Sequence, residues 1–437
     1  MKRTPDFVVA RLVAFLLVLL FLSPIVLANG IVRDSIGAVS SGRGGANVSH
    51  SDNLAILNDN PAGLAWVDDT LLFEFSGDFL IRNVHYRDPL GSDEAENRLF
   101  FLPQVSIAGR LPNSQIRLGL TAVMPGGYGA RYTLNHNPLG LSDYRSEGML
   151  LKILPTVALP LGDRVSIGGG IGLGYGRTEL RMPYTFQATP GLAGGFGTID
   201  MDADGFGVTW NAGIQVKATD RLTFGVSYIS ETLLEQEGDF FVNAPALAPA
   251  NIANYDVDAN ITWPRSFALG GNYEFDFGRL SFDTVWYNWS DAFEKFRFRL
   301  SNGDNPTIDG IAGPEPYDEF PLNWDDSVSL RLGYEHFFCE RKTVVRLGYT
   351  WNLNPIPDGT ATPLLPGILE HTVTIGLGHD FGPVKLDVAY QWAIADNQTV
   401  GVSDILGPGG TTATSDFNFS EMRAQAHWLF VTMMARF

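Results

Sequence analysis

The chain has 437 residues, with 48 acidic against 30 basic side chains and a formal net charge of -18. This acidity excludes a protein that binds nucleic acid through clustered lysines and arginines. The single cysteine, Cys339, excludes an internal disulfide framework. The composition, with 48 Gly, 29 Phe, 14 Tyr and 9 Trp, favours a large β-barrel, which can use the whole mature chain as one domain.

The first 28 residues have the order of a secretory signal peptide. Lys2 and Arg3 precede a largely apolar run over 7–27, and "VLA" closes this run before Asn29. A basic start, a hydrophobic centre and a small-residue exit are typical of a segment that is removed on export. The alternative is a retained anchor, since about 20 apolar residues can span a bilayer. We predict a cleaved signal peptide over residues 1–28.

Residues 29–69 show no strand periodicity and are rich in glycine and small polar side chains. Such a segment can be a flexible periplasmic tail or a plug, here called the hatch, that folds inside a barrel. Within it, Asn60-Pro61-Ala62 predicts a turn, because proline fixes φ and asparagine can bond to its own backbone. We predict that residues 29–69 form the hatch.

Residues 70–437 alternate between apolar and polar side chains. In "SVSLRLGY" (327–334), the apolar residues share one face and Ser327, Ser329, Arg331 and Gly333 share the other. Short turns and long Gly-, Pro-, Asn- and Asp-rich connections follow one another in turn, and no apolar run after residue 28 is long enough for a membrane helix. This predicts an all-β transmembrane barrel of about 14 antiparallel strands in a bacterial outer membrane, with both barrel ends on the periplasmic side.

The third strand of this barrel has an interruption. "QIRLGLTAVMPGGYGARY" (115–132) alternates through Met124 and then contains a run of proline and glycine. Proline cannot donate to the ladder and paired glycines weaken it, so we expect the strand to bend or lose its pairing and open the wall. The alternative is that proline simply ends the strand at an external loop. The predicted kink residues are Pro125, Gly126, Gly127, Tyr128 and Gly129.

The fifth strand places a row of glycines on its inward face. In "RVSIGGGIGLGYG" (164–176) these are every second residue from Gly168 to Gly176. Glycine in a strand interior indicates close approach by another part of the molecule, which favours a hatch inside the lumen over a periplasmic tail. The string lacks the spacing and the following helix of a dinucleotide-binding motif.

Two sets of residues are candidates for ligand contact. Apolar side chains in long loops predict a capture groove, although loops often pack into small cores of their own. Arg331 and Arg346 lie on the polar face of neighbouring strands, and arginine can bind a carboxylate head group bidentately. The alternative for both is pairing with inward acids such as Asp283 or Asp387. The predicted groove residues are Phe186, Leu192, Phe196, Phe240, Phe241, Val242, Leu247 and Ile252.

Enzymatic motifs are missing from the sequence. None of its seven histidines lies in a Gly-x-Ser-x-Gly or a His-Glu-x-x-His context. We therefore predict no catalytic residue, no bound metal and no cofactor. The last strand, "HWLFVTMMARF", alternates and ends in Phe437. A terminal aromatic on such a strand looks like the signal that the bacterial barrel-assembly machinery recognises, which predicts contact with outer-membrane lipid and lipopolysaccharide.

Five stretches carry a resemblance to a known family, the FadL (OMPP1, TodX) transporters of long-chain fatty acids and other hydrophobic compounds. They are "SSGRGGANVSHSDNLAILNDNPAGLA" (40–65), "WPRSFALGGNYEF" (263–275), "SFDTVWYNWSDA" (281–292), "VVRLGYTWNLNPIPDGT" (344–360) and "LPGILEHTVTIGLGHDF" (365–381). The resemblance covers essentially the whole mature chain. It implies a monomeric 14-stranded barrel, a hatch with an Asn-Pro-Ala motif, and an inward kink in the third strand that opens the wall sideways.

The resemblance also implies passive uptake of hydrophobic molecules, with long-chain fatty acids favoured. Monoaromatic hydrocarbons, or a structural barrel without transport, are the alternatives. The loops depart from the family pattern, so its ligand contacts do not carry over residue by residue. We expect Asn60-Pro61-Ala62 to pack against the bend at Pro125, and a shift of the hatch on ligand binding to release the molecule sideways into lipid.

Overall fold

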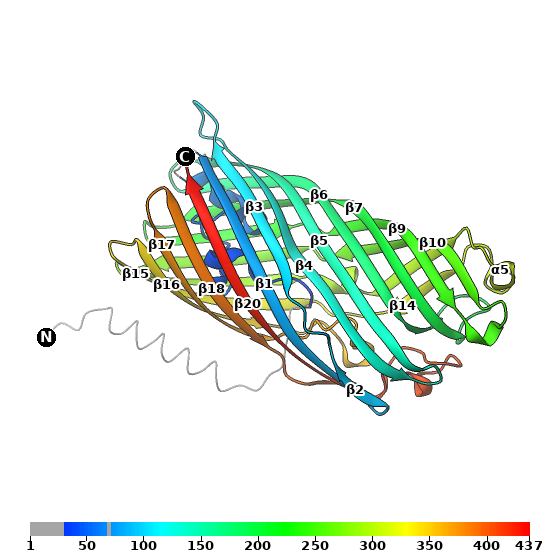
Figure 1. Cartoon of the computed structure of the whole chain (residues 1–437). Coiled ribbons are helices and arrows are strands. Elements are labelled where there is room, and N and C mark those ends of the chain that lie inside the picture. Colours follow the sequence, from blue (N-terminus) through cyan, green and yellow to red (C-terminus); the bar gives the residue numbers. More distant parts are fainter. Residues whose placement is uncertain (1–29, 68–70) are drawn as a thin grey trace.

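Alternating apolar and polar residues form one closed antiparallel sheet in the computed structural model, which describes residues 30–67 and 71–437 (Figure 1). The expected signal peptide lies outside the described residues. The strand segments are β1 (Leu71–Asp88), β2 (Gly91–Glu94), β3 (Phe100–Arg110), β4 (Arg117–His136), β5 (Gly140–Leu161), β6 (Val165–Thr185), β7 (Phe196–Lys217), β8 (Leu222–Ile229), β9 (Thr232–Asn243), β10 (Ile252–Trp263), β11 (Ser266–Glu274), β12 (Gly278–Tyr287), β13 (Lys295–Ser301), β14 (Tyr317–Pro321), β15 (Ser327–Phe338), β16 (Thr343–Asn352), β17 (His371–Asp380), β18 (Val384–Ile394), β19 (Gln398–Thr399) and β20 (Glu421–Arg436).

Fourteen strands make the wall, as predicted. Four of them are each divided into two segments, namely β8 with β9, β10 with β11, β12 with β13, and β14 with β15. β2 and β19 are short additions at strand ends. The barrel closes where β1 pairs with β20 from Leu72↔Arg436 to Arg87↔Glu421.

The predicted alternation between the two faces of the wall is confirmed. In β15, Ser327, Ser329 and Arg331 are buried inside, while Leu330 is exposed on the outer face. Apolar side chains on the outer face suit lipid, and polar side chains on the inner face suit a filled lumen. Among the described residues, none of the helices is long and apolar enough to span a membrane.

Several stretches expected as long loops are strands instead. Residues 129–146, one of the long connections rich in glycine, asparagine and aspartate, are mostly strand, because β4 ends only at His136 and β5 begins at Gly140. In β7, Asp200, Asp202 and Asp204 point outward while the residues between them are buried inside. Polar outward residues mark parts of a wall that extend beyond the apolar band. The sequence pattern was therefore misread as a loop because the outward face is polar there, while the inward face carries the apolar side chains, such as Ile199, Met201 and Tyr132.

The hatch, residues 30–67, lies inside the barrel and fills the end that holds the C-terminus (Figure 1). It contains two short helices, α2 (Gly37–Gly42) and α3 (Ile56–Asp59), and the 3-10 helix η1 (Pro61–Trp66). Its backbone is bonded to several wall strands: the amide of Ala38 donates to the Thr432 hydroxyl (2.8 Å), and the amide of Val48 donates to Asp283 (2.9 Å). The predicted plug is thus inside the lumen.

The opposite end of the barrel is closed by inserted connections. Residues 353–370, with η3 (Asp358–Thr360), and residues 400–420, with η4 (Thr412–Thr414), contribute buried Leu364, Ile368, Ile405 and Phe417 to one hydrophobic core. The remaining helical segments are η2 (Pro245–Leu247) and α5 (Pro306–Ala312), which lie in connections between strands, and α4 (Trp289–Ala292), which lies between β12 and β13, the two segments of one wall strand. The lumen is therefore filled from both ends, and free space is confined to cavities between the two fillings.

Candidate functional site

The wall is interrupted between β3 and β4. Their pairing ends at Gln104↔Val123, although β3 reaches back to Phe100 and β4 continues to His136. Residues 100–103 pair only with β1, and β4 from Gly126 onward pairs with β5. Between residues 100–103 and 124–129 the two neighbours share no ladder hydrogen bonds, so the sheet has a gap there.

A β-bulge in β4 explains the gap. The register with β5 shifts between Val123↔Lys152 and Gly126↔Leu150, which leaves one extra residue in β4. An extra residue reverses which side chains point inward. Before the bulge the odd-numbered residues Thr121 and Val123 are buried inside, and beyond it the even-numbered residues Ala130 and Tyr132 are buried inside. The predicted kink at Pro125 is thus a bulge within a strand. The alternative that proline ends the strand is wrong, because β4 continues for eleven residues beyond it to His136.

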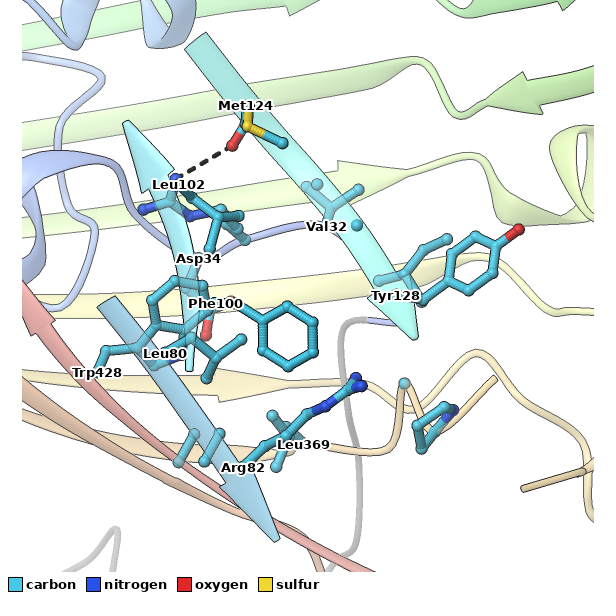
Figure 2. A pocket seen from close by; sticks show the side chains of 18 of the residues that line it. Val32, Asp34, Leu80, Arg82, Phe100, Leu102, Met124, Tyr128, Leu369 and Trp428 are labelled. Atoms are coloured by element: carbon cyan, nitrogen blue, oxygen red, sulfur yellow. Dashed lines mark hydrogen bonds between the residues drawn. The ribbon is translucent and has the colours of Figure 1, made fainter. Parts of the chain in front are cut away.

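The gap is bridged from inside by the N-terminal strap, residues 30–35. The amide of Arg33 donates to the Pro125 carbonyl (3.0 Å), the amide of Gly127 donates to the Ile31 carbonyl (3.1 Å), and Val32 forms an isolated bridge with Gly126. Figure 2 shows Val32 beside β4 and the hydrogen bond that ends on the Met124 carbonyl. The strap supplies part of the pairing that β3 does not provide.

A cavity of about 320 Å³ lies behind and within this gap. Its inner wall is mostly apolar and comes from strands on both sides of the barrel seam as well as from the inserted connection. Its lining also includes outward-facing residues of β3, β5 and β6, so it reaches from the lumen to the outer face. Inner lining residues are Leu80, Leu102, Ala393, Ala426, Trp428, Phe430 and Leu369; outer ones are Phe101, Glu147, Met149, Arg177 and Glu179.

The Asn60-Pro61-Ala62 motif has the predicted turn but not the predicted contact. The Asn60 side chain accepts a hydrogen bond from the Ala62 amide (3.1 Å) and Pro61 begins η1. The Asn60 amide group also donates to the Val48 carbonyl (2.6 Å), and the Ala62 carbonyl accepts from the Ser166 hydroxyl of β6 (3.0 Å). The expectation that this motif packs against the bend at Pro125 is wrong, because the strap occupies that place.

Glycines of the wall make room for the motif. A Cβ added at Gly168 of β6 would lie 2.5 Å from the Pro61 carbonyl carbon, and one at Gly213 of β7 would overlap the Asn60 side chain. The inward glycines of β6 thus do permit a close approach by the hatch, but only at Gly168. Gly174 and Gly176 face wall side chains such as Leu234 instead.

Arg346 is enclosed in a buried ion-pair cluster. Its guanidinium donates to Glu335 (2.9 Å) and to Asp387 (2.7 Å). Glu335 also lies 3.2 Å from Arg279 and 3.6 Å from Arg43 of the hatch. The pairing with an inward acid that the sequence offered as an alternative is present at Arg346.

His50, Asp52 and Glu335 bring together ligand-type atoms of the kind that bind metals. Arg279 donates to Asp52 (3.1 Å) and lies 3.0 Å from His50 Nδ1, and His50 Nε2 lies 2.8 Å from the Ser281 hydroxyl. Burial, and next the charge of Arg43, hold the pKa of His50 well below its ordinary value. Arginines already satisfy these atoms, so the cluster fastens the hatch to the wall.

Arg331 has a different environment from Arg346. It donates to the Tyr287 hydroxyl (2.9 Å) and to Ser329, and among the described residues it forms no ion pair. It lines a second cavity, of about 70 Å³, together with buried Lys152. Asp283, offered as its partner, instead accepts from the backbone amides of Asn47 (2.6 Å) and Val48.

The eight residues expected to form a capture groove do not lie on one surface. Phe186, Phe240 and Val242 are buried in the core of the inserted end, with Leu192 and Leu247 packed against them. Phe196, Phe241 and Ile252 lie on strand positions that point away from that core. A capture surface built from all eight is not present in this structure.

The sequence model of the protein family described as "outer membrane protein transport protein (OMPP1/FadL/TodX)" matches residues 19–437. The chain belongs to this family. A search of curated proteins finds no match. Membership makes the barrel an outer-membrane transporter of hydrophobic compounds rather than an enzyme.

Solved structures of FadL/TodX proteins have the same fold. A FadL homologue of Pseudomonas aeruginosa matches with a TM-score of 0.76 at 14% identity, covering 94% of this chain and 100% of that one. TodX of Pseudomonas putida matches with a TM-score of 0.73 at 17% identity, with the same coverage. TbuX of Ralstonia pickettii matches with a TM-score of 0.68 at 16% identity, over 92% of this chain and 99% of that one.

Two features of the site were missed by sequence reasoning. The strap, rather than the Asn-Pro-Ala motif, lies at the gap, and Arg82 of β1 lines the cavity. Alternation along "FLIRNVHY" would have placed Arg82 on the inward face beside Leu80 and Val84. No local pattern in residues 30–35 indicates a bridge to β4.

Proposed function

We propose that this FadL-family barrel takes up long-chain fatty acids passively and releases them sideways through the gap between β3 and β4. The observation that carries the proposal is the cavity that reaches both faces of the wall at this gap. An apolar path suits a molecule whose obstacle is the polar lipopolysaccharide surface. Release into the outer leaflet keeps the ligand out of water throughout.

Movement of the strap is part of the proposal. Three backbone or bridge contacts join residues 31–33 to β4, and the Arg33 guanidinium pairs with Asp78 of β1 and stacks on Trp428. A ligand that fills the cavity competes with the strap for the space between β3 and β4. We infer that displacement of the strap, with the Asn60-Pro61-Ala62 turn left in its seat, clears the path.

We infer that fewer residues than the sequence indicated capture the ligand at the cell surface. Outward-pointing Ile252 is exposed, whereas the buried members of the set act as packing for the inserted end.

We infer that the last strand, with its exposed terminal Phe437, is recognised by the barrel-assembly machinery. Outer-membrane lipid and lipopolysaccharide are the surroundings of the outer face.

Positively charged side chains that point into the lumen favour an acid as the substrate. Arg331 lacks an acidic partner among the described residues and borders a cavity, which makes it the better of the two head-group candidates. Arg346 is already bound by two carboxylates. A monoaromatic hydrocarbon is the second candidate, because similar structures include a toluene transporter, TodX, and a monoaromatic hydrocarbon channel, CymD.

Deletion of Pro125 tests the sideways exit. Removing one residue cancels the bulge. Val123 still points inward, and so do Gly126 and the even-numbered residues after it. β3 and β4 can then continue their pairing beyond Gln104. We expect uptake of radiolabelled oleate by a Gram-negative host lacking its own transporters of this family to fall to the level of cells without the protein.

Pro125→Ala is the matched control, because it keeps the number of residues and hence the bulge. We expect its uptake to stay within about twofold of the wild type. Assembly of both variants is checked by the gel shift of unheated barrels. Full oleate uptake after deletion of Pro125 would show that the ligand does not leave through this gap.

A further inference from the structure

Arg82 is a cation in the cavity without an acidic partner. It is partly buried, it faces inward from β1, and its guanidinium carbon lies 4.7 Å from the centre of the Phe100 ring. Its buried Nε makes no hydrogen bond, and within the described ranges its guanidinium forms no ion pair. By contrast, Arg33, Arg43, Arg279 and Arg346 each reach a carboxylate.

The guanidinium lies at the edge of the wall gap. β3 begins at Phe100, which pairs with Leu80, so no β3 residue stands opposite Arg82. The side chain instead reaches towards β4, where a Cβ added at Gly129 would lie 3.5 Å from Arg82 Nη2. Figure 2 shows Arg82 extending into the cavity near Leu80, Phe100 and Leu369.

The acid on the outer side of the gap is already bound. Glu147 of β5 lies 2.5 Å from Arg98 and 3.1 Å from Arg131. Arg145 lies 3.8 Å from it as well. Three arginines therefore neutralise Glu147, which leaves the guanidinium of Arg82 as an open position for an anion. A charge in an apolar cavity is costly unless it is paired and hydrogen-bonded.

We propose that Arg82 binds the carboxylate of a long-chain acid inside the gap and selects acids over neutral hydrophobic molecules. The inference rests on the proposed sideways exit and adds the residue that sets its specificity. The fork of the guanidinium matches a carboxylate, with two parallel hydrogen bonds. The apolar lining formed by Leu80, Leu102 and Trp428 takes the hydrocarbon chain next to it.

Oleate and oleyl alcohol separate charge recognition from chain recognition, because they share one hydrocarbon chain. We expect purified wild-type protein to bind oleate more tightly than oleyl alcohol. Arg82→Gln should weaken oleate binding at least about tenfold, the effect of losing a charged hydrogen-bonded pair. It should leave binding of oleyl alcohol and toluene unchanged, and Arg82→Lys should restore part of the oleate affinity.

Arg87→Gln is the matched control, because Arg87 is an exposed arginine on the same strand that pairs with Glu421 outside the cavity. It should change none of these affinities. If Arg82→Gln weakens the binding of oleate and of oleyl alcohol equally, Arg82 only shapes the cavity. If the affinity for oleate is unchanged, Arg82 binds no head group. Either result overturns the inference while leaving the sideways exit intact.

Uptake measured in cells distinguishes the two proposals. If Arg82→Gln lowers oleate uptake while deletion of Pro125 does not, Arg82 recognises acids on a path that does not cross the gap, and binding inside the gap is excluded. If deletion of Pro125 abolishes uptake of oleate and of oleyl alcohol, whereas Arg82→Gln lowers only that of oleate, both proposals are supported. If oleate uptake by Arg82→Lys is no higher than that by Arg82→Gln, the positive charge is not what recognises the acid.

Discussion

At the scale of single residues, His50 links the hatch to pH. Burial, and then the charge of Arg43, lower the pKa of His50, so the hatch fits only its neutral form. The docked state therefore has its full stability above the ordinary histidine pKa of about 6.5 and loses stability as the pH falls below it, by at most about 1.4 kcal/mol per pH unit. We expect hydrogen exchange of the amides of residues 47–63, corrected for intrinsic rates, to accelerate between pH 7.5 and pH 5.5.

His50→Gln supplies the comparison for that measurement. A glutamine amide keeps an acceptor for Arg279 and a donor for Ser281 but has no titration in this range. Its exchange rates should depend on pH less steeply than those of the wild type. Although burial opposes its charged form, the charge of Arg43 holds the pKa of Asp52 well below its usual value, so Asp52 stays charged in this window. Identical pH profiles for the two proteins would exclude His50 as the cause.

At the scale of elements, the 3-10 helix η1 is held by its fit to glycine. Pro61 lies so close to β6 that Gly168→Ala would force the hatch turn away from the wall. Overpacking of this kind costs about 1–3 kcal/mol. We expect hydrogen exchange of residues 60–66 in Gly168→Ala to rise accordingly, with the barrel itself still assembled.

Gly169→Ala is the neighbouring control, because a Cβ at Gly169 would meet only the Asn211 carbonyl oxygen, at 3.3 Å, and not the hatch. The hatch amides should exchange as in the wild type in this variant. Equal acceleration in both variants would indicate a general weakening of β6 instead of a lost seat for η1.

At the scale of the whole molecule, closure of the wall and filling of the lumen are separate. The wall closes through backbone pairing of β1 with β20, and no described hatch residue takes part in that ladder. A chain lacking residues 32–66 should therefore still assemble. It should also conduct ions through planar bilayers at least about tenfold better than the intact chain, because a barrel of this size without its filling has an aqueous lumen.

The inserted connections at the other end of the barrel, residues 353–370 and 400–420, could also block ions. They bury Leu364, Ile368 and Phe417 over the lumen. If the deletion leaves the conductance unchanged although the barrel is assembled, these connections alone seal the barrel against ions. A variant that fails to show the gel shift of an assembled barrel would contradict the independence of wall and hatch.

The sequence by itself determined the barrel, the number of its strands and, where the alternation is clear, which residues share one face of a strand. These are local properties, because a period of two follows from the backbone of a single strand. The bend at Pro125 and the turn at Asn60 were predictable for the same reason, since proline, glycine and asparagine act on their own backbone.

Only the tertiary structure decided which residues meet. Whether Arg346 pairs with Glu335 and Asp387, whether Arg82 is left open, and whether the strap or the Asn-Pro-Ala turn covers the bulge depend on segments far apart along the chain. The register of fourteen strands and the path of the hatch fix those distances together. Contacts of this kind arise from closure of the sheet, because a one-residue shift in any strand would turn its side chains to the other face.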